Sequence, residues 1–179
     1  GGGWRAAEID KQLVRFEDFL VGLKVDPAVR VRGTAIFMTQ DREGTPPALL
    51  HHLKHNQVLH EQVIILTFQT ANVPEVPPDE RVELLQLSHG FWRLIGRWGF
   101  METPNVPQVL RLAAEAGLAT TGRRSFFLGR ETFVPGGRSG MARWRKRLFM
   151  FMVRNARSPA ELFGMPPHDV VELGAQIQM

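Results

Sequence analysis

Residues 46–68, with the sequence PPALLHHLKHNQVLHEQVIILTF, decide the fold of this chain. The two prolines at its start open a helix that we expect to run to about residue 56. Residues 63–68 form a continuous apolar run, which is typical of a strand buried on both faces. A shorter strand-forming run, residues 34–38, precedes the helix, so the order strand, helix, strand predicts a right-handed parallel crossover. The buried stripe of the helix is formed by three leucines, Leu49, Leu50 and Leu53.

The remaining chain also alternates between helix and strand patterns. Residues 4–24 carry apolar side chains every three or four positions, which predicts an amphipathic helix that Asp26-Pro27 ends. Residues 82–87 and 91–98 flank a Ser-His-Gly turn and predict a β-hairpin. The pattern predicts a single-domain α/β fold with a mixed, mostly parallel sheet, flanking helices and one β-hairpin. The other expected elements are helices at 107–116, 141–155 and after Ser158-Pro159, and strands at 125–128 and 170–173.

Composition indicates one globular domain. The chain has 179 residues, of which 44% are apolar and 22% charged, values that are ordinary for a soluble fold. It contains neither an apolar run long enough to span a bilayer nor the pattern of a secretory leader, so we expect no span and no secretion. Cysteine is absent, which excludes disulfides and thiolate metal sites and fits a reducing compartment.

The charge of the chain argues against nucleic acid as a partner. The pI is about 10.3, but the net charge is only +4. With no tyrosine or cysteine and four lysines, little titrates between neutral pH and the range of arginine, so the high pI overstates the field at pH 7. A weak attraction to an anionic lipid leaflet fits this charge better.

The histidines of the deciding stretch have the spacing of metal ligands. His51 and His55 lie four residues apart, with His60 and Glu61 following. A zinc site needs three or four converging donors, and neither an HExxH order nor a second cluster is present. We therefore expect no metal, and expect the rings to cap the helix end and bond to the following loop.

Five polar residues are candidates for binding an organic ligand, and they fall into two groups. Ligands of open α/β sheets bind beyond the carboxyl ends of strands, where Arg130 and Glu131 follow the strand at 125–128. Lys54, His55 and Asn56 occupy a helix-to-strand turn, which we expect at the opposite edge of the sheet. The alternative is structural: Asn56 takes the left-handed cap of its helix, and Arg130 pairs with Glu131 or with a backbone carbonyl.

Catalytic motifs are missing, so we expect no enzyme. There is no cysteine nucleophile, no Gly-x-Ser-x-Gly elbow, no GxGxxG and no paired acidic motif. Spacing does not show whether Glu102 and Glu131 meet. The glycine-rich stretch 136–140 lacks the Walker lysine and predicts a loop. The helix at 141–155 is amphipathic, with an apolar arc that fits the core and a basic arc that could face anionic lipid.

Several motifs resemble, in order, the cytosolic C-terminal region of the Kup-type potassium uptake transporters, the KUP/HAK/KT family. The resemblance covers roughly residues 30–176. The matching motifs are RGTAIF (32–37), the histidine stretch (46–61), GFMETP with Val106-Pro107 (99–107), SFFLGRET (125–132), the late helix with Trp144-Arg145, Leu148-Phe149, Phe151-Met152 and Arg154-Asn155-Ala156, and VVELG (170–174).

The resemblance implies a non-catalytic domain on the cytoplasmic face of a membrane, in a protein that imports potassium, coupled to protons. Residues 1–30 would be a tether after a membrane domain absent from this chain, and residues 31–179 the cytosolic domain. The implied partners are that transmembrane domain and a second copy in a homodimer, formed through the hairpin at 82–98. Two alternatives stay open: a nucleotide-sensing module for an adenine second messenger, and a purely structural dimerisation domain. No cofactor is implied.

Overall fold

A six-stranded sheet organises the domain. The computed structural model describes residues 15–25, 28–39, 44–129, 161, 163–165 and 170–173. The strand order is β3-β4-β2-β1-β5-β6, and every neighbouring pair is parallel except the antiparallel pair β3 and β4. This confirms the predicted α/β fold with a mixed, mostly parallel sheet and one hairpin. The strands are β1 (Val29–Thr39), β2 (Val58–Ala71), β3 (Val82–Gln86), β4 (Phe91–Gly99), β5 (Arg124–Gly129) and β6 (Val170–Leu173).

The predicted strand–helix–strand unit lies at the centre of the sheet. The helix α3 (Pro47–Asn56) begins with a proline at its first position, and it connects β1 to β2, which pair in parallel. The strand β2 is longer than its apolar run because it pairs with β1 from Val58 and with β4 as far as Ala71. The parallel crossover between the two strands is therefore confirmed.

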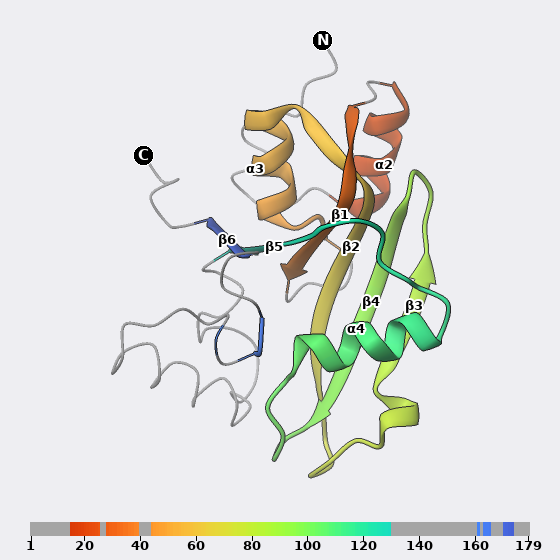
Figure 1. Ribbon diagram of the computed structural model, residues 1–179, viewed down its shortest axis with the longest axis vertical. Helices are drawn as coiled ribbons and strands as arrows, with labels where there is room; N and C mark the ends of the chain where they lie inside the picture. The colour runs from red at the N-terminus through yellow and green to blue at the C-terminus, as the bar shows by residue number, and fades with distance from the viewer. Residues whose placement is uncertain are drawn as a thin grey trace.

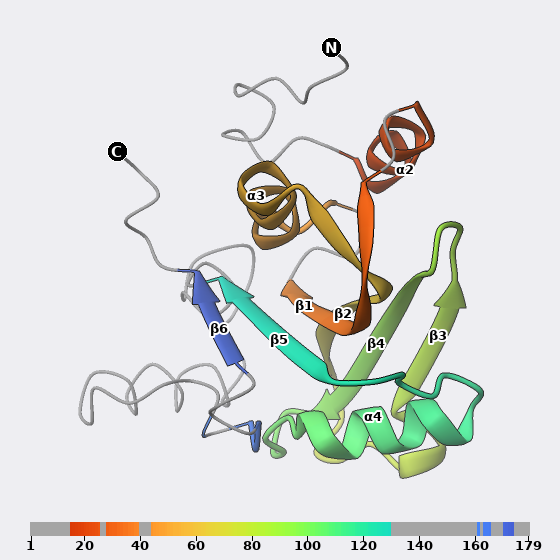
Figure 2. The same cartoon turned by 45° about the horizontal axis from the view of Figure 1, so that its top comes forward.

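Helices cover both faces of the sheet, and each face has its own apolar core (Figures 1 and 2). On one face, α2 (Phe16–Val25) and α3 pack on side chains that include Phe37, Phe91 and Phe127. On the other face, α4 (Val106–Glu115) packs on side chains that include Ile64 and Trp98. The central strands are buried on both faces, as the continuous apolar run of β2 predicts.

The hairpin and the helix after it follow their local sequence signals. The turn between β3 and β4 places His89 at φ 62° and Gly90 at φ 77°, the left-handed backbone that such turns require. The side chain of Asn105 caps α4 by accepting a hydrogen bond from the Gln108 N–H at 2.9 Å. Gly117, at φ 113°, follows the end of α4. The short 3-10 helix η1 (Pro78–Glu80) lies between β2 and β3.

Several predicted features lie outside the described residues. The N-terminal helix is described only from residue 16, as α2, and it ends at Val25 next to the predicted Asp26-Pro27 stop. The glycine-rich stretch 136–140, the helix at 141–155, and both Arg130 and Glu131 lie outside the described part. The final strand is confirmed as β6. Of the helices described, none has both the length and the apolar character needed to cross a membrane.

Candidate functional site

Four of the six histidines lie on α3 and at the start of β2, where they form two pairs of rings. His51 and His55 share a helix face because they are four residues apart, and their ring centroids are 4.1 Å apart. His52 lies on a different side of α3, and its ring centroid is 6.0 Å from that of His60 on β2. The predicted His51–His55 face is therefore present, but His60 belongs to the other pair.

The His52 ring packs against the sheet. Its centroid lies 4.8 Å from the ring of Phe127 on β5 and 6.0 Å from that of Phe37 on β1. Those two phenylalanine rings stack on each other at 4.6 Å. His52 thus joins α3 to two neighbouring strands through an aromatic cluster, with His60 at its edge, 6.1 Å from Phe127.

The prediction that Asn56 takes the left-handed cap of α3 is wrong. Gln57 takes it, at φ 56° and ψ 24°, and its backbone N–H donates to the Leu53 carbonyl at 2.9 Å. The Asn56 amide lies 2.8 Å from Nδ1 of His52, one turn earlier on α3. This contact holds Asn56 in the helix, so the left-handed residue comes one position later. With Nδ1 of His52 accepting, the ring carries its proton on Nε2.

Three of these histidines are neutral near pH 7, because their environment lowers their pKa values. Burial lowers the pKa of His52 most, and the positive charges of His60 and His51 lower it further. Burial also lowers the pKa of His60. The pKa of His51 is lowered first by burial and then by the nearby charges of His55 and Lys54. A buried ring among other bases resists protonation.

The geometry does not assemble a metal site from the histidine stretch. Within the ranges that the structure describes, no three side chains of His, Cys, Asp or Glu converge as metal ligands would. His51 and His55 form one pair, and His60 approaches His52 instead. Glu61 is exposed on β2. The absence of a metal from the whole chain stays a prediction.

The structure describes one of the two groups of candidate ligand residues. Lys54, His55 and Asn56 are exposed at the end of α3, next to the start of β2. The start of β2 pairs with the beginning of β1, where Val58 lies opposite Val29. The strand β5 pairs with a later part of β1, where Phe127 lies opposite Phe37. Arg130 and Glu131 follow directly on β5 in sequence and lie outside the described residues.

The strand order reverses between β1 and β5. From β1 the chain moves outward through β2 to β4 and then returns to the other side of β1 with β5 and β6. Ligands of open α/β sheets bind at the carboxyl ends of the strands where such a reversal occurs. Near this edge, three buried polar atoms find no hydrogen-bond partner among the described residues: Thr67 Oγ1 and Gln69 Oε1 on β2, and Thr45 Oγ1 before α3. Buried polar atoms without partners are rare in native structures and need an explanation.

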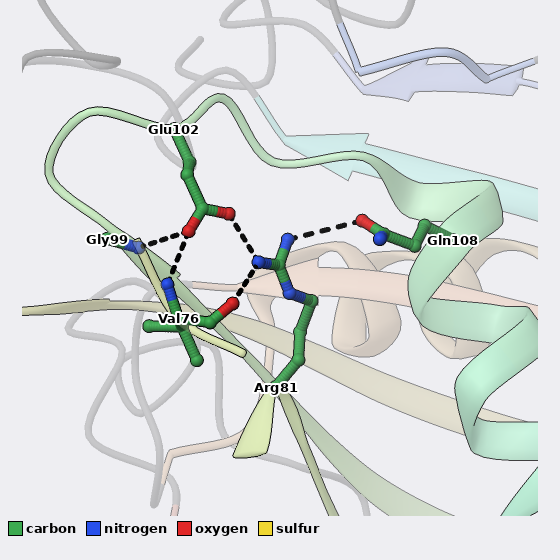
Figure 3. Close-up of polar contacts among 5 residues, drawn as sticks. All are labelled: Val76, Arg81, Gly99, Glu102 and Gln108. Atoms are coloured by element: carbon green, nitrogen blue, oxygen red, sulfur yellow. Dashed lines mark hydrogen bonds and ion pairs between the residues drawn. The ribbon is translucent and has the colours of Figure 1, made fainter. Parts of the chain in front are cut away.

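A buried ion pair, which the sequence did not predict, fastens the loops that follow β2 and β4 (Figure 3). The guanidinium of Arg81 donates to a carboxylate oxygen of Glu102, and the two side chains are only 7% and 17% exposed. Arg81 also donates to the Val76 carbonyl at 2.6 Å and to Gln108 Oε1 of α4 at 3.2 Å. Its guanidinium carbon lies 5.6 Å from the centre of the Trp98 ring.

The other carboxylate oxygen of Glu102 ties the same loops together. It accepts hydrogen bonds from the backbone N–H groups of Val76 at 2.5 Å and Gly99 at 3.4 Å. A Cβ at Gly99 would lie 2.1 Å from the Pro74 carbonyl oxygen, so only glycine allows the loops to approach so closely. Glu102 is thus a structural anchor in the described part of the chain. No spacing rule links Arg81 and Glu102; the only sequence signal was that Glu102 lies in the GFMETP motif.

Comparison with known proteins identifies the family. A family model for the K+ potassium transporter C-terminal domain matches residues 32–179. The chain belongs to this family. It is 57% identical over 154 residues to the probable potassium transport system protein Kup of Myxococcus xanthus, covering 86% of this chain and 24% of the relative. To Kup 2 of Chromobacterium violaceum it is 47% identical over 173 residues, covering 94% of this chain and 27% of the relative.

A third Kup protein, Kup 1 of Syntrophobacter fumaroxidans, is 48% identical over 177 residues, which cover 96% of this chain and 27% of the relative. The chain thus spans about a quarter of the length of the curated Kup relatives that it matches. These findings confirm the resemblance to Kup-type transporters. No solved structure matches the chain.

Proposed function

We propose that this chain is a non-catalytic domain on the cytoplasmic face of a potassium transporter, where it supports assembly or regulates transport. The observation that carries the proposal is the family match over residues 32–179, together with relatives that are about four times longer and are named potassium transport proteins. The whole protein would import potassium, coupled to protons. The ion path would belong to the part that this chain lacks, and residues 1–30 would connect the two.

The transmembrane domain of the same transporter is the partner that this function requires. The sequence alone left open a catalytic role for Glu102. In the structure its carboxylate forms an ion pair with Arg81 and accepts hydrogen bonds from two backbone N–H groups. That arrangement supports a structural role and not a catalytic one. The candidate residues for a regulatory contact are then Arg130 and Glu131, which follow β5 in sequence, and Lys54, His55 and Asn56, which are exposed at the end of α3.

The test compares a variant at Arg130 with a control variant at another arginine in the full-length transporter. Rubidium uptake would be measured in cells that lack their own potassium uptake, with the transporter quantified in the membrane. We expect Arg130→Ala to change uptake at unchanged abundance, because an arginine beyond a strand end can hold a carboxylate or phosphate with two hydrogen bonds. Arg111→Ala, at an exposed arginine of α4 that belongs to neither group, serves as the matched control. If Arg130→Ala leaves uptake unchanged, or lowers it only through loss of protein, Arg130 has a structural role.

A second candidate function is the sensing of a nucleotide, with an adenine second messenger as the ligand. The observation in its favour is the set of unpartnered buried oxygens of Thr45, Thr67 and Gln69 near the edge where the strand order reverses. A ligand that binds only the folded state raises its stability, and so its melting temperature, with the logarithm of the ligand concentration once that concentration exceeds the Kd. Adenine nucleotides should therefore stabilise the chain, and Thr67→Val, which keeps the shape, should weaken the effect. A purely structural domain would show no shift with any nucleotide.

The third role is homodimerisation through the hairpin of β3 and β4. In its favour, β3 lies at the end of the strand order and Leu85 on it is 55% exposed. An edge strand offers unpaired backbone groups to a second copy. Light scattering of the isolated chain should give a dimer that Leu85→Lys converts to a monomer; a monomer at high concentration contradicts this role. A contact between the helix at 141–155 and anionic lipid stays a prediction.

A further inference from the structure

The histidine pair formed by His52 and His60 is not explained by any of these roles. The two rings approach within 6.0 Å between centroids, at the point where α3 meets β2 and β5. Within the described part of the chain, each ring has one buried nitrogen without a hydrogen-bond partner, Nε2 of His52 and Nδ1 of His60. A scaffold would be better served by apolar side chains here, because an unpaired buried polar atom destabilises a fold.

Protonation has a specific cost at this place. His52 already uses Nδ1 to accept from the Asn56 amide, so a proton added there would remove the acceptor of that bond unless the amide turns over. Among the described residues, Nε2 of His52 has no hydrogen-bond acceptor. The rings of Phe127 and Phe37 lie 4.8 Å and 6.0 Å from the His52 ring, so a charge on it would lie beside apolar groups.

The charged groups around the pair are mostly basic. On α3 these are His51, Lys54 and His55, and on β1 it is Arg30, which donates to the His60 carbonyl at 2.9 Å. From β2 comes Glu61, which is exposed and, by the alternation of a strand, points away from its neighbour His60. On β5, Arg124 is exposed at the start of the strand. Both rings have pKa values below the ordinary range for histidine, burial being the largest cause.

We propose that His52 and His60 form a proton-operated latch, in which the neutral rings hold the last turns of α3 against β2 and β5 and a proton on either ring releases them. The latch goes beyond the proposed function. Only its physiological consequence rests on that function: acidification of the cytoplasm would free the exposed segment that contains Lys54, His55 and Asn56. Two protons at once are disfavoured because the charges would lie close together, so a single proton operates the latch.

Hydrogen exchange on the 179-residue chain tests the latch, with α4 on the opposite face as the internal reference. Protection factors, which correct for the pH dependence of chemical exchange, would be compared at pH 7.5 and 5.5. An opening that takes up one proton becomes up to about tenfold more favourable per pH unit below the pKa of the released ring. We expect the amides of residues 53–57 to lose up to about tenfold in protection relative to those of α4.

Substitutions separate the latch from a general loss of stability. His52→Phe/His60→Phe keeps aromatic packing and cannot titrate, so α3 and α4 should then respond equally to pH. His52→Gln/His60→Gln, which keeps hydrogen-bonding side chains and cannot titrate at either position, gives the same readout if the phenylalanine variant does not fold. His89→Asn alters an exposed histidine in the β3–β4 turn and should behave as the wild type. Equal responses of α3 and α4 in the wild type, or a wild-type response in the non-titrating variants, would overturn the proposal. Because no transport is measured, the result is independent of whether the proposed function holds.

Discussion

The ion pair of Arg81 and Glu102 gives the sharpest test of how the domain is held together. Glu102→Gln keeps the size of the side chain and one acceptor oxygen but removes the charge that Arg81 faces. Breaking a buried ion pair by removing one partner typically costs about 3–5 kcal/mol. Arg81 would retain the Val76 carbonyl and Gln108, and the Glu102 side chain is 17% exposed, so we expect a smaller loss than this range, about 2–3 kcal/mol.

The assay is urea unfolding at pH 7, followed by tryptophan fluorescence, with thermal unfolding alongside. For a domain of this length, each kcal/mol shifts the melting temperature by about 2–4 °C, so Glu102→Gln should lower it by about 4–12 °C. The matched control is Glu83→Gln, which breaks the exposed pair of Glu83 and Arg97, whose side chains are 49% and 30% exposed. That change should cost less than about 1 kcal/mol. Equal losses in the two variants would refute the view that burial makes the Arg81–Glu102 pair important.

Three further changes probe other parts of the account. Gly99→Ala should destabilise the domain by more than about 2 kcal/mol in urea unfolding, because the new Cβ would collide with the Pro74 carbonyl. In the control Gly117→Ala the new Cβ meets no atom within 4 Å, so this variant has only backbone strain, and similar losses in the two variants would contradict the prediction. Asn105→Ala removes the cap of α4 and should cost about 1 kcal/mol, and no change in the urea midpoint would contradict the capping role. His52 and His60 have folded pKa values below the unfolded value of about 6.5, so their contribution to stability is present above that pH and is lost as the pH falls below it; a urea midpoint that is constant from pH 7.5 to 5.5 would contradict these shifts.

Local patterns were sufficient to predict most of the fold. The prolines before α3, the apolar run in β2 and the turn between β3 and β4 each act within a few residues, and the structure follows them. The extent of the strands was less predictable, because it depends on partners. The strand β1 begins at Val29 and not near residue 34, since it pairs with the polar start of β2.

The candidate site could be predicted only in part. The stretch that contains Lys54, His55 and Asn56 does lie at the end of α3, but Asn56 is not its left-handed residue, because a hydrogen bond to His52 keeps it helical. Side chains that meet across the sheet leave no local pattern. His52 contacts Phe127 of β5, and Arg81 binds Glu102. The residues of each pair are far apart in the sequence and meet only when the sheet is assembled.

Uptake by a truncated transporter tests the central claim, that this domain contributes to potassium transport, most directly. Rubidium uptake would be measured in cells without their own potassium uptake, for the full-length protein and for a form that ends before the region matching residue 32, at equal abundance in the membrane. We expect the truncated form to reach the membrane, and we expect its uptake to be lost or to no longer change with potassium concentration and pH. Uptake equal to that of the full-length protein at every potassium concentration and pH would contradict it.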